Sequence, residues 1–170
     1  MPSPAMPKFE EIAARLPDGL VRAGYRVVYL AALVFCFIFR PAARSAAAAL
    51  WHRDRLLLVR TSYRRDYTLP GGLCRRGEAF RQAAARELAE ETGIALPSAR
   101  LSPAGVFRGR FEFRRDRAAL FESRLPAAPK VRIDRREVVW AGFLRVARIR
   151  RLPHSPLLAF YLKRHGQDGP

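Results

Sequence analysis

The stretch from Gly71 to Ile94, GGLCRRGEAFRQAAARELAEETGI, decides how the rest of the chain is interpreted. Acidic residues gather in it, although the whole chain holds 32 Lys and Arg against 15 Asp and Glu and carries a net charge of +17. Composition therefore does not explain the cluster. Its members are Glu78, Glu87, Glu90 and Glu91.

Most of this stretch has the pattern of one helix. Alanine is frequent and helix breakers are few, which predicts a helix over 77–92. Phe80, Ala84 and Leu88 recur at every fourth position, so we expect them to form the stripe that faces the core. Gly93 is well placed to end the helix, because glycine tolerates the left-handed conformation at a helix C-terminus.

The spacing of the glutamates indicates a metal site. Glu87, Glu90 and Glu91 stand at i, i+3 and i+4 and so share one helix face. Anions held this close repel one another, and a hard divalent cation with oxygen ligands, Mg²⁺ or Mn²⁺, would offset the repulsion. The adjacent Gly71 and Gly72 allow a tight turn that brings a backbone carbonyl near the ion. The alternative is a solvated helix face with Arg86 paired to Glu90.

The same spacing carries a family resemblance. The pattern G-x5-E-x7-R-E-U-x-E-E-x-G-U, in which U is an apolar residue, matches from Gly72 to Ile94 and resembles the signature of the Nudix hydrolases. The resemblance implies an α/β (α+β) fold, with a mixed β-sheet sandwiched between helices. The order of predicted elements extends the likeness over 44–165, and we expect a domain there, an extension at 1–43 and a polar tail at 166–170.

The resemblance also implies a role for each signature residue. Glu90 and Glu91 match the main metal ligands, and Glu87 matches a third ligand or a general base. The carbonyl of Gly71 matches a backbone ligand, and Arg86 matches the arginine that orients the glutamates. Gly72, Glu78 and Gly93 match structural positions, with Glu78 also an additional metal-coordinating position in the family. The implied reaction is attack of water on a nucleoside diphosphate linked to another group, with Mg²⁺ or Mn²⁺ as cofactor. The substrate stays open: where the ADP-ribose type has a proline downstream, this chain has Gly109.

Further site residues are predicted outside the signature. Glu137 is the candidate for an extra base or ligand, and Asp134 is the second choice; the alternative is a solvent-facing carboxylate at a strand end. Arginines before the Pro-Gly-Gly turn could contact substrate phosphates or be solvated: Arg60, Arg64 and Arg65. Three aromatic residues could stack on a base, although core or rim positions are favoured for them: Tyr63, Tyr67 and Phe107.

The remaining elements are predicted from alternation and turn signals. We expect a hairpin of strands 45–51 and 56–59, a strand at 67–69, and a second hairpin of strands 106–113 and 118–124 that turns at 114–116. A short extended piece is expected at 131–133 and a strand at 137–146. A last helix, 157–163, should follow Ser155 as N-cap and Pro156 in the first turn. A short helix is expected at 9–16.

An apolar segment, about 20–39, precedes the domain, and Val27 to Phe39 is an uncharged run. We favour a helix buried against the domain or against a partner subunit, which would make a homodimer contact. One alternative is a membrane-associated helix between flanking arginines, because an all-round apolar helix is either buried or in lipid. The other is a buried strand at 35–39.

Composition limits the remaining function classes. The arginines are scattered and lack an aromatic-interleaved tract, so we expect no dedicated nucleic-acid surface and a nucleotide-type small molecule as partner. Cys36 and Cys74 form no disulfide framework, which favours a cytoplasmic protein, with membrane-peripheral placement as the alternative. The rival functions are a non-catalytic nucleotide- or RNA-binding module and a membrane-associated protein that uses the apolar segment.

Overall fold

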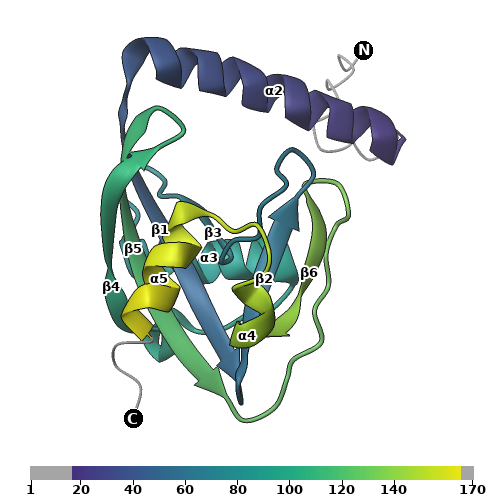
Figure 1. Cartoon of the computed structure of the whole chain (residues 1–170), viewed down its shortest axis with the longest axis vertical. Coiled ribbons are helices and arrows are strands. Elements are labelled where there is room, and N and C mark those ends of the chain that lie inside the picture. The colour runs from purple at the N-terminus through teal and green to yellow at the C-terminus, as the bar shows by residue number, and fades with distance from the viewer. Residues whose placement is uncertain (1–16, 166–170) are drawn as a thin grey trace, which may run out of the picture.

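The structure is a computed structural model that describes residues 17–165, without the side chains of residues 110, 111 and 114. One mixed sheet forms its centre (Figure 1). The strands are β1 (Ala42–His52), β2 (Arg55–Thr61), β3 (Gly71–Leu73), β4 (Ser102–Phe111), β5 (Arg114–Leu125) and β6 (Val138–Arg145). Their order is β4-β5-β1-β2-β6, and β3 pairs with β1. The β1–β5 pair is parallel and the other pairs are antiparallel, as a mixed sheet requires.

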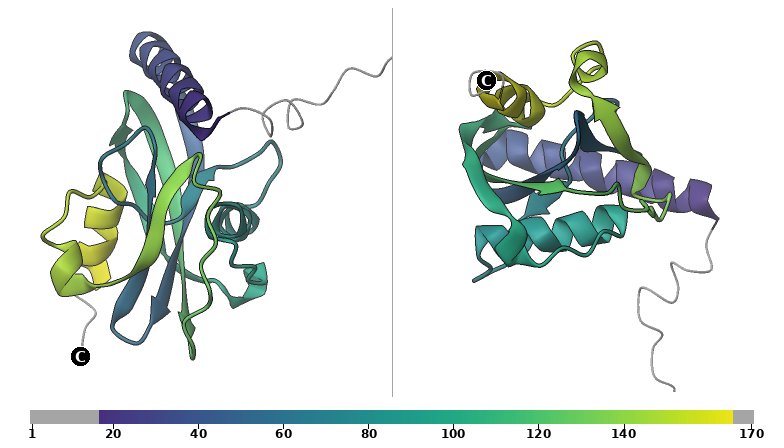
Figure 2. Two further views of the ribbon diagram at one scale, coloured as in Figure 1. Left: turned by 90° about the vertical axis from the view of Figure 1, so that its right-hand side faces the viewer. Right: turned by 90° about the horizontal axis from the view of Figure 1, so that it is seen from below.

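Helices cover both faces of the sheet (Figure 2). On one face lie α3 (Phe80–Thr92) and the 3₁₀ helix η1 (Ser98–Arg100), and on the other lie α4 (Val146–Ile149) and α5 (Pro156–His165). Strand β1 is buried from both sides, so its run of alanines contributes alternate residues to two cores. Ala48 and Leu50 pack toward Leu88 of α3, whereas Ala49 and Trp51 pack toward the opposite helices.

The predicted elements are confirmed in outline. The first hairpin, the signature helix, the second hairpin, the late strand and the last helix all form. Ser155 caps α5 as expected, because its Oγ accepts a hydrogen bond of 3.2 Å from the N–H of Leu158. Ala84 and Leu88 are fully buried, and Phe80 packs against the same core cluster. The helix expected at 9–16 and the tail 166–170 lie outside the described residues.

Several predicted boundaries were wrong. Helix α3 begins at Phe80 rather than at 77, because Gly77 has a φ of +77° and forms a turn. The strand expected at 67–69 is reduced to isolated bridges, and the paired strand is β3, inside the expected glycine turn. The second hairpin turns at Glu112 and Phe113, both with positive φ, rather than at 114–116. Residues 131–133 form no strand, and α4 and η1 were not predicted.

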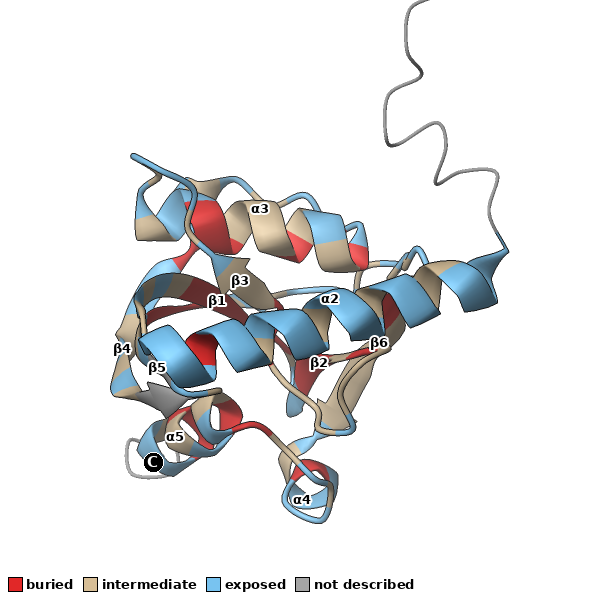
Figure 3. Cartoon of the chain, turned by 90° about the horizontal axis from the view of Figure 1, so that it is seen from above, coloured by how far each residue is buried: buried red, intermediate tan, exposed pale blue. Residues whose placement is uncertain are grey.

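The apolar segment forms a single helix, α2 (Asp18–Phe39), which lies across the end of the domain above the strands (Figures 1 and 3). Cys36 is its one buried residue, so the expectation of a helix buried against the domain was wrong, as was the strand at 35–39. Burial against a partner subunit and association with a membrane stay predictions. A domain core can bury only the side that faces it. Among the described residues this is the one helix that is long and apolar enough to cross a membrane, with a mean hydropathy of 1.7.

Candidate functional site

Arg86 holds the acidic cluster together. Its Nε and Nη2 donate to the two oxygens of Glu78 at 2.8 and 2.9 Å, and its Nη1 donates to Glu87 at 2.7 Å and to Glu90 at 3.0 Å. Nη2 also donates to the carbonyl of Leu73 at 3.0 Å. One planar guanidinium thus fixes the helix to the loop that precedes it, as bidentate arginine–carboxylate pairs do.

The two partners in the bidentate pair shift each other's pKa. The hydrogen bonds from Arg86, and then that from the backbone N–H of Arg75, hold the pKa of Glu78 at about 2. The hydrogen bonds to Glu78 in turn raise the pKa of Arg86 above its usual value. Both groups are therefore charged throughout the physiological pH range, and their ion pair persists at every pH in it.

Glu91 reaches the glycine turn from the next turn of the helix. Its Oε2 accepts a hydrogen bond of 2.9 Å from the N–H of Gly71. The pKa of Glu91 is raised to about 8, chiefly by removal from water and also by the nearby carboxylates of Glu87 and Glu137, while the hydrogen bond from Gly71 acts in the opposite direction. Without a compensating cation, this carboxyl group is largely protonated at neutral pH.

Gly71 and Gly72, at the start of β3, stand where a larger residue would clash with its neighbours. A Cβ on Gly71 would lie 2.5 Å from the carbonyl oxygen of Ala46 and 2.7 Å from Cα of Ala47, both in the central strand. A Cβ on Gly72 would lie 2.6 Å from the carboxylate of Glu87. Side chains are therefore excluded at two adjacent positions, one by the sheet and the other by a site carboxylate.

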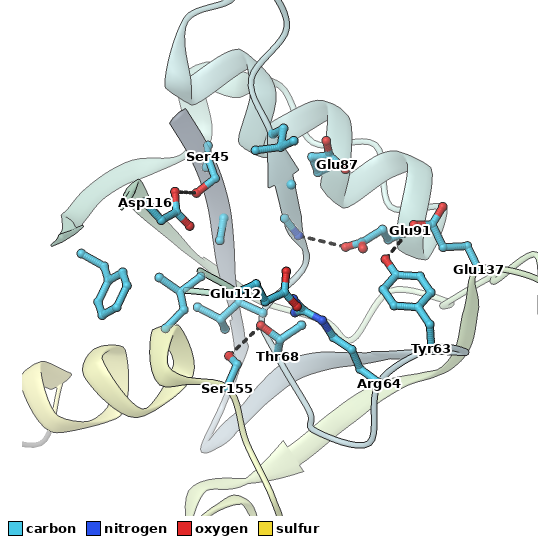
Figure 4. Close-up of a pocket in the computed structure, with 18 of the residues that line it drawn as sticks. Ser45, Tyr63, Arg64, Thr68, Glu87, Glu91, Glu112, Asp116, Glu137 and Ser155 are labelled. Carbon is cyan, nitrogen blue, oxygen red and sulfur yellow. Dashed lines mark hydrogen bonds and ion pairs between the residues drawn. The ribbon is translucent and has the colours of Figure 1, made fainter. Parts of the chain in front are cut away.

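Gly71 and Gly72 border a cavity of about 370 Å³ at the strand ends (Figure 4). Glu87 and Glu91 reach it from α3, and Glu137 reaches it from the segment just before β6. Burial raises the pKa of both Glu87 and Glu137. Glu137 also accepts a hydrogen bond of 3.1 Å from the hydroxyl of Tyr63. Carboxylates from two segments that are distant in sequence thus face one space.

Other predicted site residues lie apart from this space. Glu90 is half-exposed and turns to Arg86 and to Arg75 rather than lining the cavity. Asp134 accepts hydrogen bonds from three backbone N–H groups, those of residues 136, 137 and 138, so it shapes the loop that carries Glu137. Gly93 ends α3 with a φ of +69°, as expected of a helix stop.

The three arginines that precede the Pro-Gly-Gly segment lie in different places relative to the cavity. Arg64 lines the cavity and pairs with Glu112, whereas Arg65 is exposed. Arg60 lies outside the lining, with its guanidinium 5.7 Å from the ring centre of Tyr67. Among the aromatic candidates, Tyr63 and Phe107 line the cavity, and Tyr67 instead packs edge-on against Trp140.

Several lining residues were not predicted. Glu112 and Asp116 come from the β4–β5 hairpin, and Tyr29 and Ala32 come from α2. Asp116 accepts a hydrogen bond of 2.8 Å from Ser45 of β1, through the parallel β1–β5 pairing. The sequence carries one signal for Glu112, which is an acid between two phenylalanines in a basic hairpin. Nothing in the sequence pattern marked α2 as a cavity wall.

The donor set fits a hard divalent cation. Within residues 17–165, no three carboxylate, imidazole or thiolate groups are arranged closely enough to hold an ion in their present rotamers. The side chains of Glu87 and Glu90 accept hydrogen bonds from Arg86, while the partly buried Glu91 accepts one from a neutral donor, the N–H of Gly71. Carboxylate oxygens are the donors that Mg²⁺ and Mn²⁺ select, and Glu91 would hold such an ion together with one or more of its neighbours Glu87, Glu90 and Glu137.

Comparisons with known proteins agree with the architecture. The sequence profile of the NUDIX domain matches residues 41–161. A MutT protein from Methanosarcina mazei Go1 has a similar structure, with a TM-score of 0.66, 20% identity and coverage of 78% of this chain and 99% of that one. No match is found among curated proteins.

Two further similar structures hold nucleotides. The NUDIX domain of Shewanella oneidensis NrtR, complexed with ADP ribose, has a TM-score of 0.66 at 16% identity and covers 95% of this chain and 98% of that one. A bifunctional NMN adenylyltransferase/ADP ribose pyrophosphatase from Francisella tularensis, complexed with AMP and a Mn ion, has a TM-score of 0.68 at 19% identity. The match covers 85% of this chain and 48% of that one. At these identities the likeness concerns the fold.

Proposed function

The chain belongs to the NUDIX family, and from that premise we propose that it is a divalent-cation-dependent hydrolase of a nucleoside diphosphate linked to another group. The bond broken is the P–O–P bridge. Water supplies the new oxygen on one phosphorus, and the other phosphate departs with the bridging oxygen. Mg²⁺ is the proposed cofactor, and Mn²⁺ is the alternative.

One observation carries the proposal: Glu87, Glu91 and Glu137 border the same cavity although they come from two separate segments. Burial raises the pKa of each, so each carboxyl group is held in an environment that disfavours its negative charge. Without a compensating cation such a cluster costs stability, and clusters of this kind are typical of functional sites. A bound divalent ion would neutralise charge on the substrate phosphates and lower the pKa of a water molecule.

The chain's own residues have separable roles in this proposal. Glu91, oriented by the N–H of Gly71, would bind the cation, with Glu90 as the neighbouring ligand after it leaves Arg86. Glu87 and Glu137 are the two candidates for the group that accepts a proton from the attacking water. Arg86 would act as a positioning residue, because its contacts are to carboxylates and to the Leu73 carbonyl.

The substrate side of the cavity is suited to a nucleotide. Arg64, which pairs with Glu112 at the cavity wall, would turn its guanidinium to a phosphate, and Tyr63 and Phe107 supply aromatic surfaces for a base. Two structural neighbours are complexes, one with ADP ribose and the other with AMP and a Mn ion. These likenesses support a nucleotide-type ligand as a class, and the group attached to the second phosphate is left to experiment.

A substrate panel tests the proposal. Purified protein is incubated with dNTPs, oxidised dNTPs, nucleotide sugars, ADP-ribose and dinucleoside polyphosphates, with Mg²⁺, with Mn²⁺ or with EDTA. We expect a nucleoside monophosphate product from at least one compound when metal is present, and no product from any compound in EDTA. If nucleotides bind, as shown by thermal shift, but no compound is hydrolysed with either metal, the protein is a nucleotide-binding module instead.

A further inference from the structure

Helix α2 presents its sides in the reverse of the usual order. A helix on the surface of a soluble protein turns its apolar side to the core and its polar side to water. In α2 the side that meets the domain carries Asp18, Arg22 and Tyr29 and ends in apolar residues, whereas the opposite side is apolar along its length. Most of the helix is exposed (Figure 3). The apolar residues of this outer face are 53–68% exposed: Leu20, Val27, Val28, Leu30, Val34, Phe35, Phe37, Ile38 and Phe39.

Polar contacts fix the inner side to the domain. Asp18 pairs with Arg136 at 3.0 Å, and Arg22 donates to the carbonyl of Arg135 at 2.7 and 3.0 Å. Farther along, the hydroxyl of Tyr29 donates to Glu112 at 2.6 Å. The contacting residues stand four and seven positions apart, on one side of α2, so they set the rotation of the helix about its own axis. The outer face is therefore held outward by the rest of the fold.

The apolar surface continues onto the domain and has a basic border. The ring of Phe113, at the tip of the β4–β5 hairpin, lies 5.2 Å from the ring of Phe37 and is 52% exposed. A contiguous apolar patch of this kind marks a surface that another phase or molecule covers. Exposed arginines stand in the segments that adjoin α2: Arg40, Arg65, Arg115 and Arg135.

We propose that α2 binds an anionic lipid bilayer in the plane of its surface, with the outer face among the acyl chains and the arginine border at the headgroups. The helix is 22 residues long, about 33 Å at 1.5 Å per residue. An apolar face rimmed by arginine matches both layers of such an interface. A second copy of the chain matches it less well, since each copy carries a charge of +17.

An in-plane position also preserves the polar contacts. In a membrane-spanning helix, Asp18, Arg22 and Tyr29 would have to leave their partners, and some of these groups would enter hydrocarbon. Lying flat, α2 keeps those contacts in water and buries only its outer face. Since Tyr29 and Ala32 line the cavity, the same helix would then form the boundary between the bilayer and the site.

Vesicle sedimentation tests the proposal with the full-length protein. Vesicles of phosphatidylcholine are used with and without phosphatidylglycerol, at low and at high salt. We expect sedimentation with the anionic vesicles, at least about tenfold stronger than with neutral ones and weakened by salt. If the protein stays in the supernatant with both kinds of vesicle, the proposal is wrong.

Paired variants identify the surface. Val34→Asp with Ile38→Asp places two charges on the outer face, and neither residue lines the cavity. This variant should lose vesicle binding at least about tenfold and keep its helical circular dichroism and any turnover measured without vesicles. Val106→Asp, on exposed β4, is the control and should bind as the wild type does. Equal binding by all three proteins would overturn the proposal.

Two further measurements separate the other occupants. With Leu30→Trp, quenchers near the headgroups should reduce the added fluorescence more than quenchers at the bilayer centre; the reverse result would indicate a spanning helix. Light scattering should give a monomer without vesicles. If the wild type is instead a dimer, and the double variant Val34→Asp with Ile38→Asp is a monomer, the outer face binds a second copy of the chain. Vesicle binding is measured without substrate, so it holds or fails independently of the proposed hydrolysis.

Discussion

The N–H of Gly71 donates a hydrogen bond of 2.9 Å to Oε2 of Glu91, and this bond joins the start of β3 to the C-terminal half of α3. The two residues bring a strand that pairs with the central β1 and the helix that packs on it to one point at the cavity edge. Glu91 is thereby aimed by the sheet itself.

The raised pKa of Glu91 predicts how stability depends on pH in EDTA. Its pKa is about 8 in the folded protein, against an ordinary value of 4.5, so the folded state binds more protons between these values. Stability should therefore fall as the pH rises from about 4.5 to 8, by at most about 1.4 kcal/mol per pH unit from this group. Glu91→Gln should flatten the slope in urea titrations. An unchanged slope would contradict the burial of this carboxyl group.

The adjacent glycines should respond differently to alanine. Gly71→Ala forces a Cβ into the backbone of β1 and should cost about 2 kcal/mol of unfolding free energy. Gly72→Ala instead displaces the Glu87 carboxylate, a flexible group, so the fold should persist while metal-dependent turnover falls about 10- to 100-fold. Thermal unfolding and kinetics on the pair check this. Equal losses of stability in the two variants would refute the assigned contacts.

Removal of Arg86 should harm the fold as well as the site. Arg86→Met leaves Glu78 and Glu87, which are 14% and 15% exposed, without their cation and should cost about 3 kcal/mol. Arg75→Met is the matched control: its guanidinium is 68% exposed and pairs with Glu90 at the surface, so the cost should stay below about 1 kcal/mol. Denaturant titration measures both unfolding free energies, and similar losses would show that Arg86 stabilises the fold no more than a surface arginine does.

Glu137 and Asp134 offer a test of the second carboxylate position. Glu137→Gln removes an ionisable group from the cavity and should lower kcat about 100-fold or more if it accepts the proton from water, with loss of the acidic limb of the pH–rate profile. Asp134→Asn keeps a side-chain oxygen for the backbone N–H groups and should leave kcat within about threefold of wild type. If Glu137→Gln keeps the wild-type pH profile, Glu87 is the base.

Local signals predicted the signature helix and the sheet well. The repeat of Phe80, Ala84 and Leu88 identified the buried stripe of α3, and the Ser155-Pro156 pair identified the start of α5. Both features depend on neighbours within about one helical turn, so the sequence contains them directly. The bond between Arg86 and Glu90 is of the same local kind.

The rest of the cavity depends on pairing between distant segments. Asp116 reaches the site because β5 runs parallel to β1 and aligns it with Ala43, more than 70 positions earlier. Tyr29 reaches it because α2 docks across the strand ends. Hydropathy predicted the extent of that helix but not its exposure on the domain, since apolar content alone does not tell a helix buried in the core from one that faces outward.

The most direct test of the central claim is metal-dependent turnover by Glu91→Gln, beside Asp54→Asn as a surface control whose pairing with Arg145 is largely exposed. On a substrate found in the panel, Glu91→Gln should lose at least about 100-fold in kcat/KM with Mg²⁺, remain folded, and no longer gain thermal stability from Mn²⁺. Asp54→Asn should match the wild type. Wild-type turnover and metal response in Glu91→Gln would contradict its assignment as a metal ligand.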